Sequence, residues 1–390
     1  MLTAHTEIMA RLRKSLDPHI GSILVVGGPG HGDHCRELAI AAAYPEGRNV
    51  VALMQFNGSL VEWDLGEAAV KAGTVDAFVV SQLPSRGVLL SDPWLREHFT
   101  IIDAIPFAPT IYHQTGRHHP AEEEMLRPFL RYYSDHPWSL WRIADEGMTW
   151  WEIASACLGM TVTPDAIPVP LECSAPPTPE QYSTCGPVDD IDLLVNTSGS
   201  SNWEKADLHG ISRYVLVQNA AGGGAKSKIA PPELFDGIVA RLALDGVRCV
   251  QVGLETEPRI KDAIDRRGLR LPLTCRLLKG AIAHIACEGF MQYPGFGLKL
   301  PGVCFFGPTP WQLFWHNRNL NVIRGGSGLC PNNSCFWLTN KWGIGCMAFD
   351  GGYCAKMPQP KDCLDDISKF VLSCEEVKEH AQKPATEAVV

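Results

Sequence analysis

The chain has 390 residues, a hydrophobic content of 45% and a formal net charge of −9. This length suggests two domains, and the acidic balance argues against a nucleic-acid-binding surface. Residues 1–15 carry several charges and lack the apolar core of a signal peptide, and no apolar run reaches transmembrane length. We therefore expect a cytoplasmic protein whose cysteines are thiols or metal ligands rather than disulfides.

The first part of the chain alternates strand and helix patterns, which is typical of an α/β layer. A glycine-rich turn at 27–33 follows the first apolar run. The following part, 121–159, is helical and aromatic. The predicted strands are 22–26, 49–53, 76–80 and 100–105, and the predicted helices are 35–43 and 65–72.

A segment without apolar periodicity, 173–190, is rich in proline and polar residues and indicates an interdomain linker. A second α/β unit follows it. Its predicted strands are 214–218, 247–252, 285–287 and 303–306, and its predicted helices are 232–244, 277–283 and 365–380. The expected division is therefore a first domain at 1–172, the linker at 173–190, a second domain at 191–325, a cysteine-rich loop at 326–360 and a C-terminal helix and tail at 361–390.

Four cysteines near the C-terminus, Cys330, Cys335, Cys346 and Cys354, have four, ten and seven residues between them. Four thiolates that converge on one point satisfy a tetrahedral Zn²⁺ or Fe ion, and the residues between them are turn formers. The alternative is that each is a small buried hydrophobe. We expect a structural metal site, with Cys363 as the substitute if one ligand is misassigned.

Three motifs stand in a fixed order along the chain. Gly32-Asp33 follows the first strand, Gly222 and the run 228–233 follow the first strand of the second half, and 306–309 reads Phe-Gly-Pro-Thr. Together they resemble glycosyltransferase family 9, the ADP-heptose-dependent heptosyltransferases. The four-cysteine loop after the Gly-Pro-Thr turn resembles the autotransporter heptosyltransferase branch, which carries an iron site there. The resemblance implies a GT-B fold, an α/β architecture of two Rossmann-like domains facing across a cleft, the first for the acceptor and the second for the nucleotide-sugar.

On the acceptor side, the resemblance makes Asp33 the general base that takes the proton of the acceptor hydroxyl. The alternative is that Asp33 caps the helix that starts there. On the donor side, Lys228 matches the lysine that faces the donor diphosphate, with Lys226 as a competitor, and an exposed loop lysine is the ordinary explanation for either.

The remaining donor-binding residues follow from the same resemblance. Gly222 and Gly223 would offer backbone amides to phosphate oxygens, Glu288 with Gly289 would contact sugar or ribose hydroxyls, and Thr309 ends the Gly-Pro-Thr turn. Two positions depart from the family pattern, because a glycine is replaced by Phe290 and a histidine by Tyr293.

The resemblance therefore implies an inverting glycosyltransferase that moves a heptose or related sugar from a nucleotide diphosphate donor, with ADP-heptose as the expected donor. The acceptor is a hydroxyl of a protein or a saccharide, the metal is structural, and a homo-oligomer is left open. Two alternatives remain at this point: a nucleotide-sugar epimerase of the same fold, and a non-catalytic paralogue that binds a partner.

Overall fold

The computed structural model describes residues 2–28, 30–56, 59–82, 86–104, 109–112, 149–175, 177–178, 199–220, 228–309, 311–314, 316–322, 354 and 360–382. The chain divides into two compact units. Unit 1 consists of residues 1–201, 270–275 and 312–314, and unit 2 of residues 202–269, 276–311 and 315–390.

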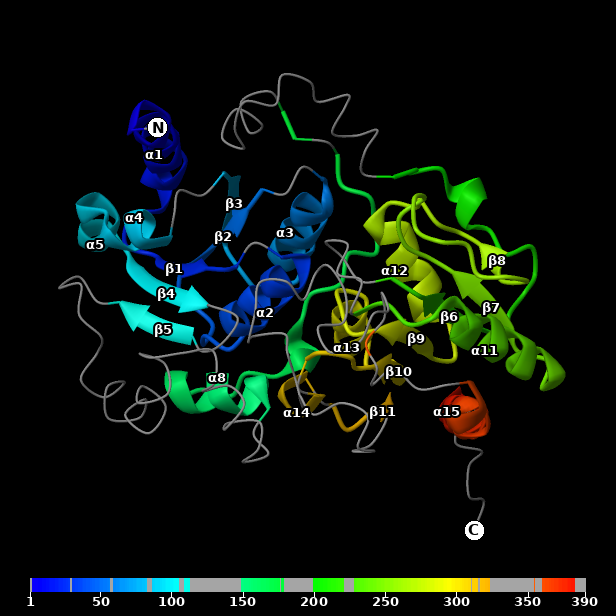
Figure 1. Ribbon diagram of the computed structural model, residues 1–390. Helices are drawn as coiled ribbons and strands as arrows, with labels where there is room; N and C mark the ends of the chain where they lie inside the picture. Colours follow the sequence, from blue (N-terminus) through cyan, green and yellow to red (C-terminus); the bar gives the residue numbers. More distant parts are fainter. Residues whose placement is uncertain are drawn as a thin grey trace, which may run out of the picture. The chain divides into compact units, whose positions relative to one another are not determined.

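Unit 1 contains a sheet with the strand order β3-β2-β1-β4-β5 (Figure 1). The first four strands are parallel and the edge strand β5 runs antiparallel to β4. The central strand β1 is buried on both faces, which its uninterrupted apolar sequence predicts. The strands are β1 (Ile23–Val26), β2 (Val50–Gln55), β3 (Ala77–Ser81), β4 (Thr100–Ala104) and β5 (Pro109–Tyr112).

Helices cover both faces of this sheet. Leu24 and Val26 of β1 share an apolar cluster with Leu12 and Leu16 of α1 (Leu2–Leu16) and with residues of α4 (Arg86–Ser91) and α5 (Pro93–His98). The other face is covered by α2 (His31–Ala41) and α3 (Val61–Lys71), which contact each other (Figure 1). The helix α8 (Trp150–Leu158) packs near β5.

The helix α2 begins at His31 and not at residue 35, so the predicted start was wrong. Gly30 is in extended conformation just before the helix, and Asp33 accepts a hydrogen bond from its backbone N–H. This contact satisfies one of the unpaired amides of the first turn and stabilises the earlier start. Asp33 therefore lies in the first turn of α2 rather than in a loop.

Unit 2 contains a six-stranded sheet in the order β11-β10-β9-β6-β7-β8, and all its neighbouring pairs are parallel. Expected strands at 214–218, 247–252, 285–287 and 303–306 are confirmed within two residues. The edge strands β8 and β11 were not predicted. The strands are β6 (Tyr214–Gln218), β7 (Arg248–Gln251), β8 (Ile264–Asp265), β9 (His284–Cys287), β10 (Gly302–Phe305) and β11 (Asn319–Val322).

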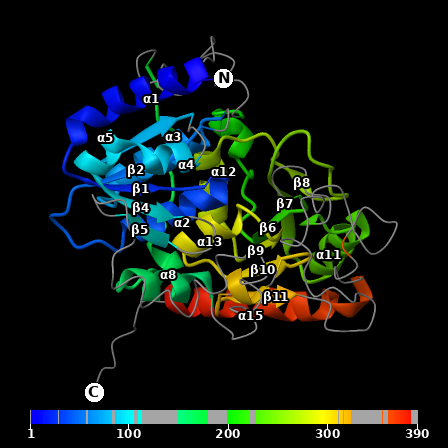
Figure 2. The same ribbon diagram turned by 60° about the vertical axis from the view of Figure 1, so that its left-hand side comes forward.

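One face of this sheet packs on α11 (Pro232–Leu244) and α15 (Leu364–Gln382). The two helices contact each other (Figure 2), with Leu364 and Pro360 against Gly237, where an added Cβ would lie 3.3 Å from each. Arg213 holds α15 in place by donating two hydrogen bonds to Glu375, of 2.6 and 2.7 Å. The predicted helix at 232–244 is confirmed at both ends.

The helix α12 (Leu271–Gly280) is the main correction in this half, because the prediction placed it at 277–283. Pro272 stands in its first turn, where a missing N–H costs nothing, so it is compatible with the helix rather than a break. The amide of Thr274 donates to the Arg270 carbonyl. A shorter helix, α13 (Gln292–Gly297), follows β9, and α14 (Trp311–Phe314) follows β10. Among the described residues, no helix is both long and apolar enough to cross a membrane.

Candidate functional site

Three residues that the sequence nominated for donor binding lie together in unit 2. Lys228, Glu288 and Thr309 follow β6, β9 and β10 respectively, and these strands are neighbours in the sheet. Because the strands are parallel, their carboxyl ends meet at one edge. Ligands of open α/β sheets bind outside this edge.

The side chains of Lys228 and Thr309 both contact one carboxylate oxygen of Glu288. Lys228 Nζ lies 2.5 Å from Glu288 Oε2, and Thr309 Oγ1 donates a hydrogen bond to the same oxygen at 3.0 Å. The lysine and glutamate side chains are 12% and 8% exposed, and Thr309 is buried. The Glu288 backbone N–H donates to the Phe305 carbonyl at 2.9 Å, which fixes the backbone of Glu288 to the end of β10. The arrangement presents a fixed ammonium group and two oxygen-bearing side chains at the sheet edge.

Next to this cluster, Gln292 begins α13 and is fully buried. Its Oε1 accepts a hydrogen bond of 3.4 Å from the thiol of Cys304, and its Nε2 has no partner among the described residues. Sequence reasoning missed Gln292, although a polar residue among apolar neighbours was the available signal. Tyr293, which replaces a histidine of the family pattern, is buried and packs edge-to-face on Phe296 with ring centroids 6.0 Å apart.

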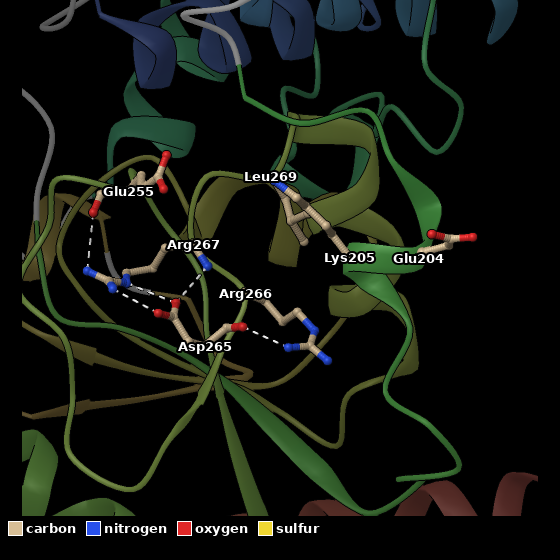
Figure 3. A pocket seen from close by; sticks show the side chains of 7 residues that line it. All are labelled: Glu204, Lys205, Glu255, Asp265, Arg266, Arg267 and Leu269. Carbon is tan, nitrogen blue, oxygen red and sulfur yellow. Dashed lines mark hydrogen bonds and ion pairs between the residues drawn. The ribbon is translucent and has the colours of Figure 1, made fainter.

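A cavity of about 320 Å³ lies further along unit 2, just after the end of β8 (Figure 3). Figure 3 shows Arg267 between Asp265 and Glu255, with Lys205 and Glu204 on a separate segment. Arg267 binds the Asp265 carboxylate at 2.9 and 2.8 Å and the Glu255 carbonyl at 3.3 Å. Hydrogen bonding to Arg267 lowers the pKa of Asp265 to about 2. This cavity could not be predicted from the sequence, because β8 is only two residues long.

Gln251, at the end of β7, holds the loop that leads toward this cavity. Its amide donates to the Pro258 carbonyl at 2.7 Å and accepts from the Ile260 N–H at 2.8 Å. Asn219, which follows β6, also donates to the Pro258 carbonyl, at 3.2 Å. These buried side chains hold the loop in place and are not themselves accessible to a ligand.

In unit 1, Asp33 lies near the carboxyl end of β1, on the first turn of α2. Its Oδ2 accepts the Gly30 N–H at 3.0 Å, and its Oδ1 is paired with the Arg36 guanidinium. A Cβ added to Gly28 would lie 2.6 Å from Asp33 Oδ2, so the side chain rests directly on the backbone of that glycine. The structure therefore shows the helix-capping contact of Asp33, and its side chain remains 13% exposed.

Arg36 is held in place from two sides. Its guanidinium carbon lies 5.5 Å from the ring centre of Trp150 and 5.3 Å from that of Phe314. Both distances fall in the range of cation–π contacts. The two rings and the pairing with Asp33 together restrict the guanidinium to one position.

Beneath the same loop, His34 and Glu37 form a fully buried pair, with Nδ1 3.2 Å from Glu37 Oε2. The other ring nitrogen lies 3.1 Å from the Gln55 carbonyl, which only accepts hydrogen bonds. Burial lowers the pKa of His34, but the hydrogen bond and the charges of Glu37, Glu62 and Asp33 outweigh this, so the net pKa is raised. The raised pKa favours the protonated form of the imidazole beside the buried Glu37 carboxylate.

Several nominated residues lie outside the described part of the chain, namely Gly222, Gly223, Lys226, Cys330, Cys335 and Cys346. Of the expected metal ligands, Cys354 is described, and it is buried in the apolar cluster of unit 2 near Cys363. Among the described residues, no group of three or more His, Cys, Asp or Glu side chains lies close enough to hold a metal ion.

No protein-family model matches the sequence, and no curated protein matches it. Among solved structures, the ADP-heptose LPS heptosyltransferase II of E. coli is 12% identical, with a TM-score of 0.48 over 91% of this chain and 99% of the other. The iron-containing dodecameric glycosyltransferase TibC of enterotoxigenic E. coli H10407 is 13% identical, with a TM-score of 0.49 over 93% and 77%. A glycosyl transferase family 9 protein of Veillonella parvula DSM 2008 is 13% identical, with a TM-score of 0.45 over 78% and 88%. All three TM-scores lie below 0.5.

Proposed function

We propose that the protein is an inverting glycosyltransferase of the GT-B type, which transfers a heptose or related sugar from a nucleotide diphosphate donor to a hydroxyl group. ADP-heptose is the donor that the sequence motifs favour. The observation that carries the proposal is the convergence of Lys228, Glu288 and Thr309 at the carboxyl edge of the unit 2 sheet. An ammonium group held beside a carboxylate and a hydroxyl suits a ligand that combines phosphate with sugar hydroxyls.

Lys228 acts on the diphosphate in this proposal. As the bond between the sugar carbon and the phosphate oxygen breaks, negative charge grows on the leaving nucleotide, and a fixed cation stabilises that charge. Glu288 accepts hydrogen bonds from the hydroxyls of the sugar or ribose, while Gly222 and Gly223 donate backbone amides to phosphate oxygens. The cavity next to Arg267 lies at the same edge of the same sheet and offers room for the nucleoside.

Asp33 acts on the acceptor. An inverting transfer displaces the leaving group in one step, so the attacking hydroxyl must lose its proton as the new bond forms. A carboxylate that is fixed by Gly30 and Arg36 and still partly exposed can accept a hydrogen bond from that hydroxyl. We propose Asp33 as the catalytic carboxylate that activates it.

Three further features belong to the proposal. The acceptor is a protein or a saccharide that supplies the hydroxyl. The cysteines Cys330, Cys335, Cys346 and Cys354 hold one structural Fe or Zn ion. With four protein thiolates, such a site is closed and contributes to folding rather than to the transfer step.

Calorimetric titration with ADP and with ADP-heptose tests the donor site. Lys228→Ala should weaken the binding of both, and we expect a loss of about tenfold or more, since charge-assisted hydrogen bonds contribute about 1.5–3 kcal/mol. Thr309→Val removes one hydroxyl without changing the shape of the side chain and should weaken binding less. The matched control is Lys279→Ala, because Lys279 is exposed in the last turn of α12, which leads to the amino end of β9.

The titration has two informative failures. If wild-type protein binds neither ligand, the donor assignment is wrong. If Lys228→Ala binds like the Lys279→Ala control, another cation, with Lys226 as the first candidate, contacts the diphosphate. Proton NMR of ADP-heptose incubated without an acceptor separates the remaining alternatives. An epimerase would invert one carbon of the sugar, which leaves the mass unchanged but shifts the ring-proton signals, whereas a non-catalytic paralogue would leave the sugar unchanged.

A further inference from the structure

A buried thiol stands at the base of the donor-site cluster in unit 2. Cys287 is the last residue of β9, and Glu288 follows it directly. The Cys287 sulfur accepts a hydrogen bond from the Ala230 N–H at 3.3 Å and donates one to the Asn219 carbonyl at 3.6 Å. One side chain of β9 therefore holds two separate positions of the backbone.

These two positions lie on either side of Lys228 in the sequence. Asn219 directly follows β6, and Ala230 lies shortly after Lys228 and before α11. Because β6 and β9 are neighbouring parallel strands, Cys287 lies beside the chain where it leaves β6. The sulfur thus fixes the backbone both before and after the lysine that we assign to the diphosphate.

The amide of Ala230 is the important donor on the second side. Pro231 and Pro232 follow it and have no N–H, so this amide is the one backbone donor of the three residues. Ala230 is buried, and a buried N–H without an acceptor is costly. The Cys287 sulfur supplies that acceptor, so removing it leaves the start of α11 without this attachment.

Asn219 is held from two directions on the first side. Its side chain donates to the Pro258 carbonyl at 3.2 Å and accepts from Gln251 Nε2 at 3.4 Å, while its carbonyl accepts from Cys287. Burial raises the pKa of Cys287 to about 12, although the hydrogen bond from Ala230 lowers it. At neutral pH the sulfur therefore keeps its hydrogen and can donate and accept at the same time.

We propose that Cys287 is the positioning residue of Lys228, and that its two hydrogen bonds hold the ammonium group where it contacts the donor diphosphate. This inference rests on the proposed transferase function. Cys287 is buried and does not itself touch the ligand. It acts through the backbone, because Glu288 is the next residue in the chain and Ala230 lies close to Lys228. The two side chains that meet at 2.5 Å are thus held by one thiol.

Calorimetric titration of the full-length protein with ADP tests the inference. Cys287→Ala removes both hydrogen bonds and should weaken ADP binding by about threefold to tenfold. Cys287→Ser keeps a donor and an acceptor and should restore most of the affinity. The matched control is Cys249→Ala, which removes a buried thiol of β7 from the same apolar cluster and should bind ADP as the wild type does. Thermal unfolding checks that each variant is folded.

A double variant separates positioning from a general loss of structure. If Cys287 acts through Lys228, Cys287→Ala should have little further effect on ADP binding in a Lys228→Ala background. Equal losses in both backgrounds, or wild-type affinity in Cys287→Ala, overturn the inference while the proposed function stands. Absence of both ADP and ADP-heptose binding in the wild type overturns the proposed function and this inference with it.

A second measurement does not depend on a ligand. Hydrogen exchange at the Ala230 amide, followed by NMR of ¹⁵N-alanine-labelled protein, should become faster in Cys287→Ala and return toward the wild-type rate in Cys287→Ser. Cys249→Ala should leave this rate unchanged. An Ala230 amide that exchanges as slowly in Cys287→Ala as in the wild type would contradict the hydrogen bond on which the proposal depends.

Discussion

Arg270 and Asp64 form a bidentate ion pair in the interior of unit 1, with Nε–Oδ2 and Nη2–Oδ1 distances of 3.0 and 2.6 Å. They are 206 positions apart in the sequence, and both side chains are buried. Burial raises the pKa of Asp64 to about 6, although the hydrogen bond and charge of Arg270 lower it. The pair therefore offsets a desolvation penalty rather than adding a large net stability.

Removing one member of this pair should be costly. Arg270→Ala leaves a carboxylate buried without its counter-ion, and we expect the free energy of unfolding to fall by about 3–5 kcal/mol. The double variant Arg270→Met with Asp64→Leu removes both charges and should recover most of that loss. Urea unfolding measures both. A loss below about 1 kcal/mol in Arg270→Ala, the range of surface pairs, would contradict the prediction.

His284 should make unit 2 sensitive to acid. Burial lowers the pKa of His284 to about 4, from an ordinary 6.5, although a hydrogen bond with the Pro301 backbone raises it. As the pH falls from 6.5 toward 4, the unfolded chain takes up a proton that the folded protein excludes, so stability decreases, in total by about 3 kcal/mol. Below the folded pKa the effect levels off.

Chemical unfolding of wild type and His284→Leu across this pH range measures the effect. The difference in stability between the two proteins should change with pH, since leucine does not titrate. His209→Gln is the control and should follow the wild-type curve. Parallel curves for wild type and His284→Leu would show that the imidazole is not excluded from protonation.

Gly302 should not tolerate a side chain. A Cβ at this position would lie 2.1 Å from the His284 ring, so Gly302→Ala forces the imidazole out of place. We expect a loss of about 1–3 kcal/mol, the cost of overpacking a core. Combining it with His284→Ala should cost less than the sum of the two changes, and a thermodynamic cycle measures this coupling. Simple additivity would mean that the backbone, and not the ring, resists the methyl group.

Asp33 should have separable effects on stability and turnover. Asp33→Asn keeps an oxygen that can cap α2 but removes the charge that pairs with Arg36, whereas Asp33→Ala removes both contacts, so Asp33→Asn should lower the unfolding free energy less than Asp33→Ala. Both variants should lose turnover, because both lack the carboxylate that activates the acceptor hydroxyl. Full activity in Asp33→Asn would leave capping as the role of this residue.

The cysteine loop should carry one metal ion. Replacing any of Cys330, Cys335, Cys346 or Cys354 by serine should lower metal content and thermal stability together, because a structural site contributes on the order of 10 kcal/mol to the fold around it. Cys374→Ser is the control, since burial raises the pKa of this thiol to about 11 and so disfavours the thiolate. Loss of metal in Cys363→Ser would make Cys363 a ligand in place of one of the four. Full metal occupancy in all four loop variants would exclude this site.

The α/β alternation could be predicted from the sequence because buried parallel strands are uninterrupted apolar runs. The strands β1, β6 and β10 were found on that basis within a residue or two. The strand β8 could not be, since two residues show no periodicity. The start of α12 was missed because Pro272 looks like a break until its place in the first turn is known.

The candidate site also has some residues that could be predicted from the sequence and some contacts that could not. Lys228, Glu288 and Thr309 could be nominated because each directly follows a strand or a recognisable turn, and the order of strands then brings them together. The contacts of Arg36 with Trp150 and Phe314 could not be predicted, because they join α2 to α8 and α14 and depend on how these helices pack. No spacing in a sequence reports a distance between side chains of different elements.

The C-terminal helix α15 has a consequence for the order in which the chain folds. Ile367 and Val371 cover the same apolar cluster that contains Val303 and Phe305 of β10. During synthesis, the strands of unit 2 therefore leave the ribosome before the helix that shields one of their faces. Until α15 has emerged, this face is exposed to other apolar surfaces, which is the condition under which nascent chains aggregate or engage chaperones.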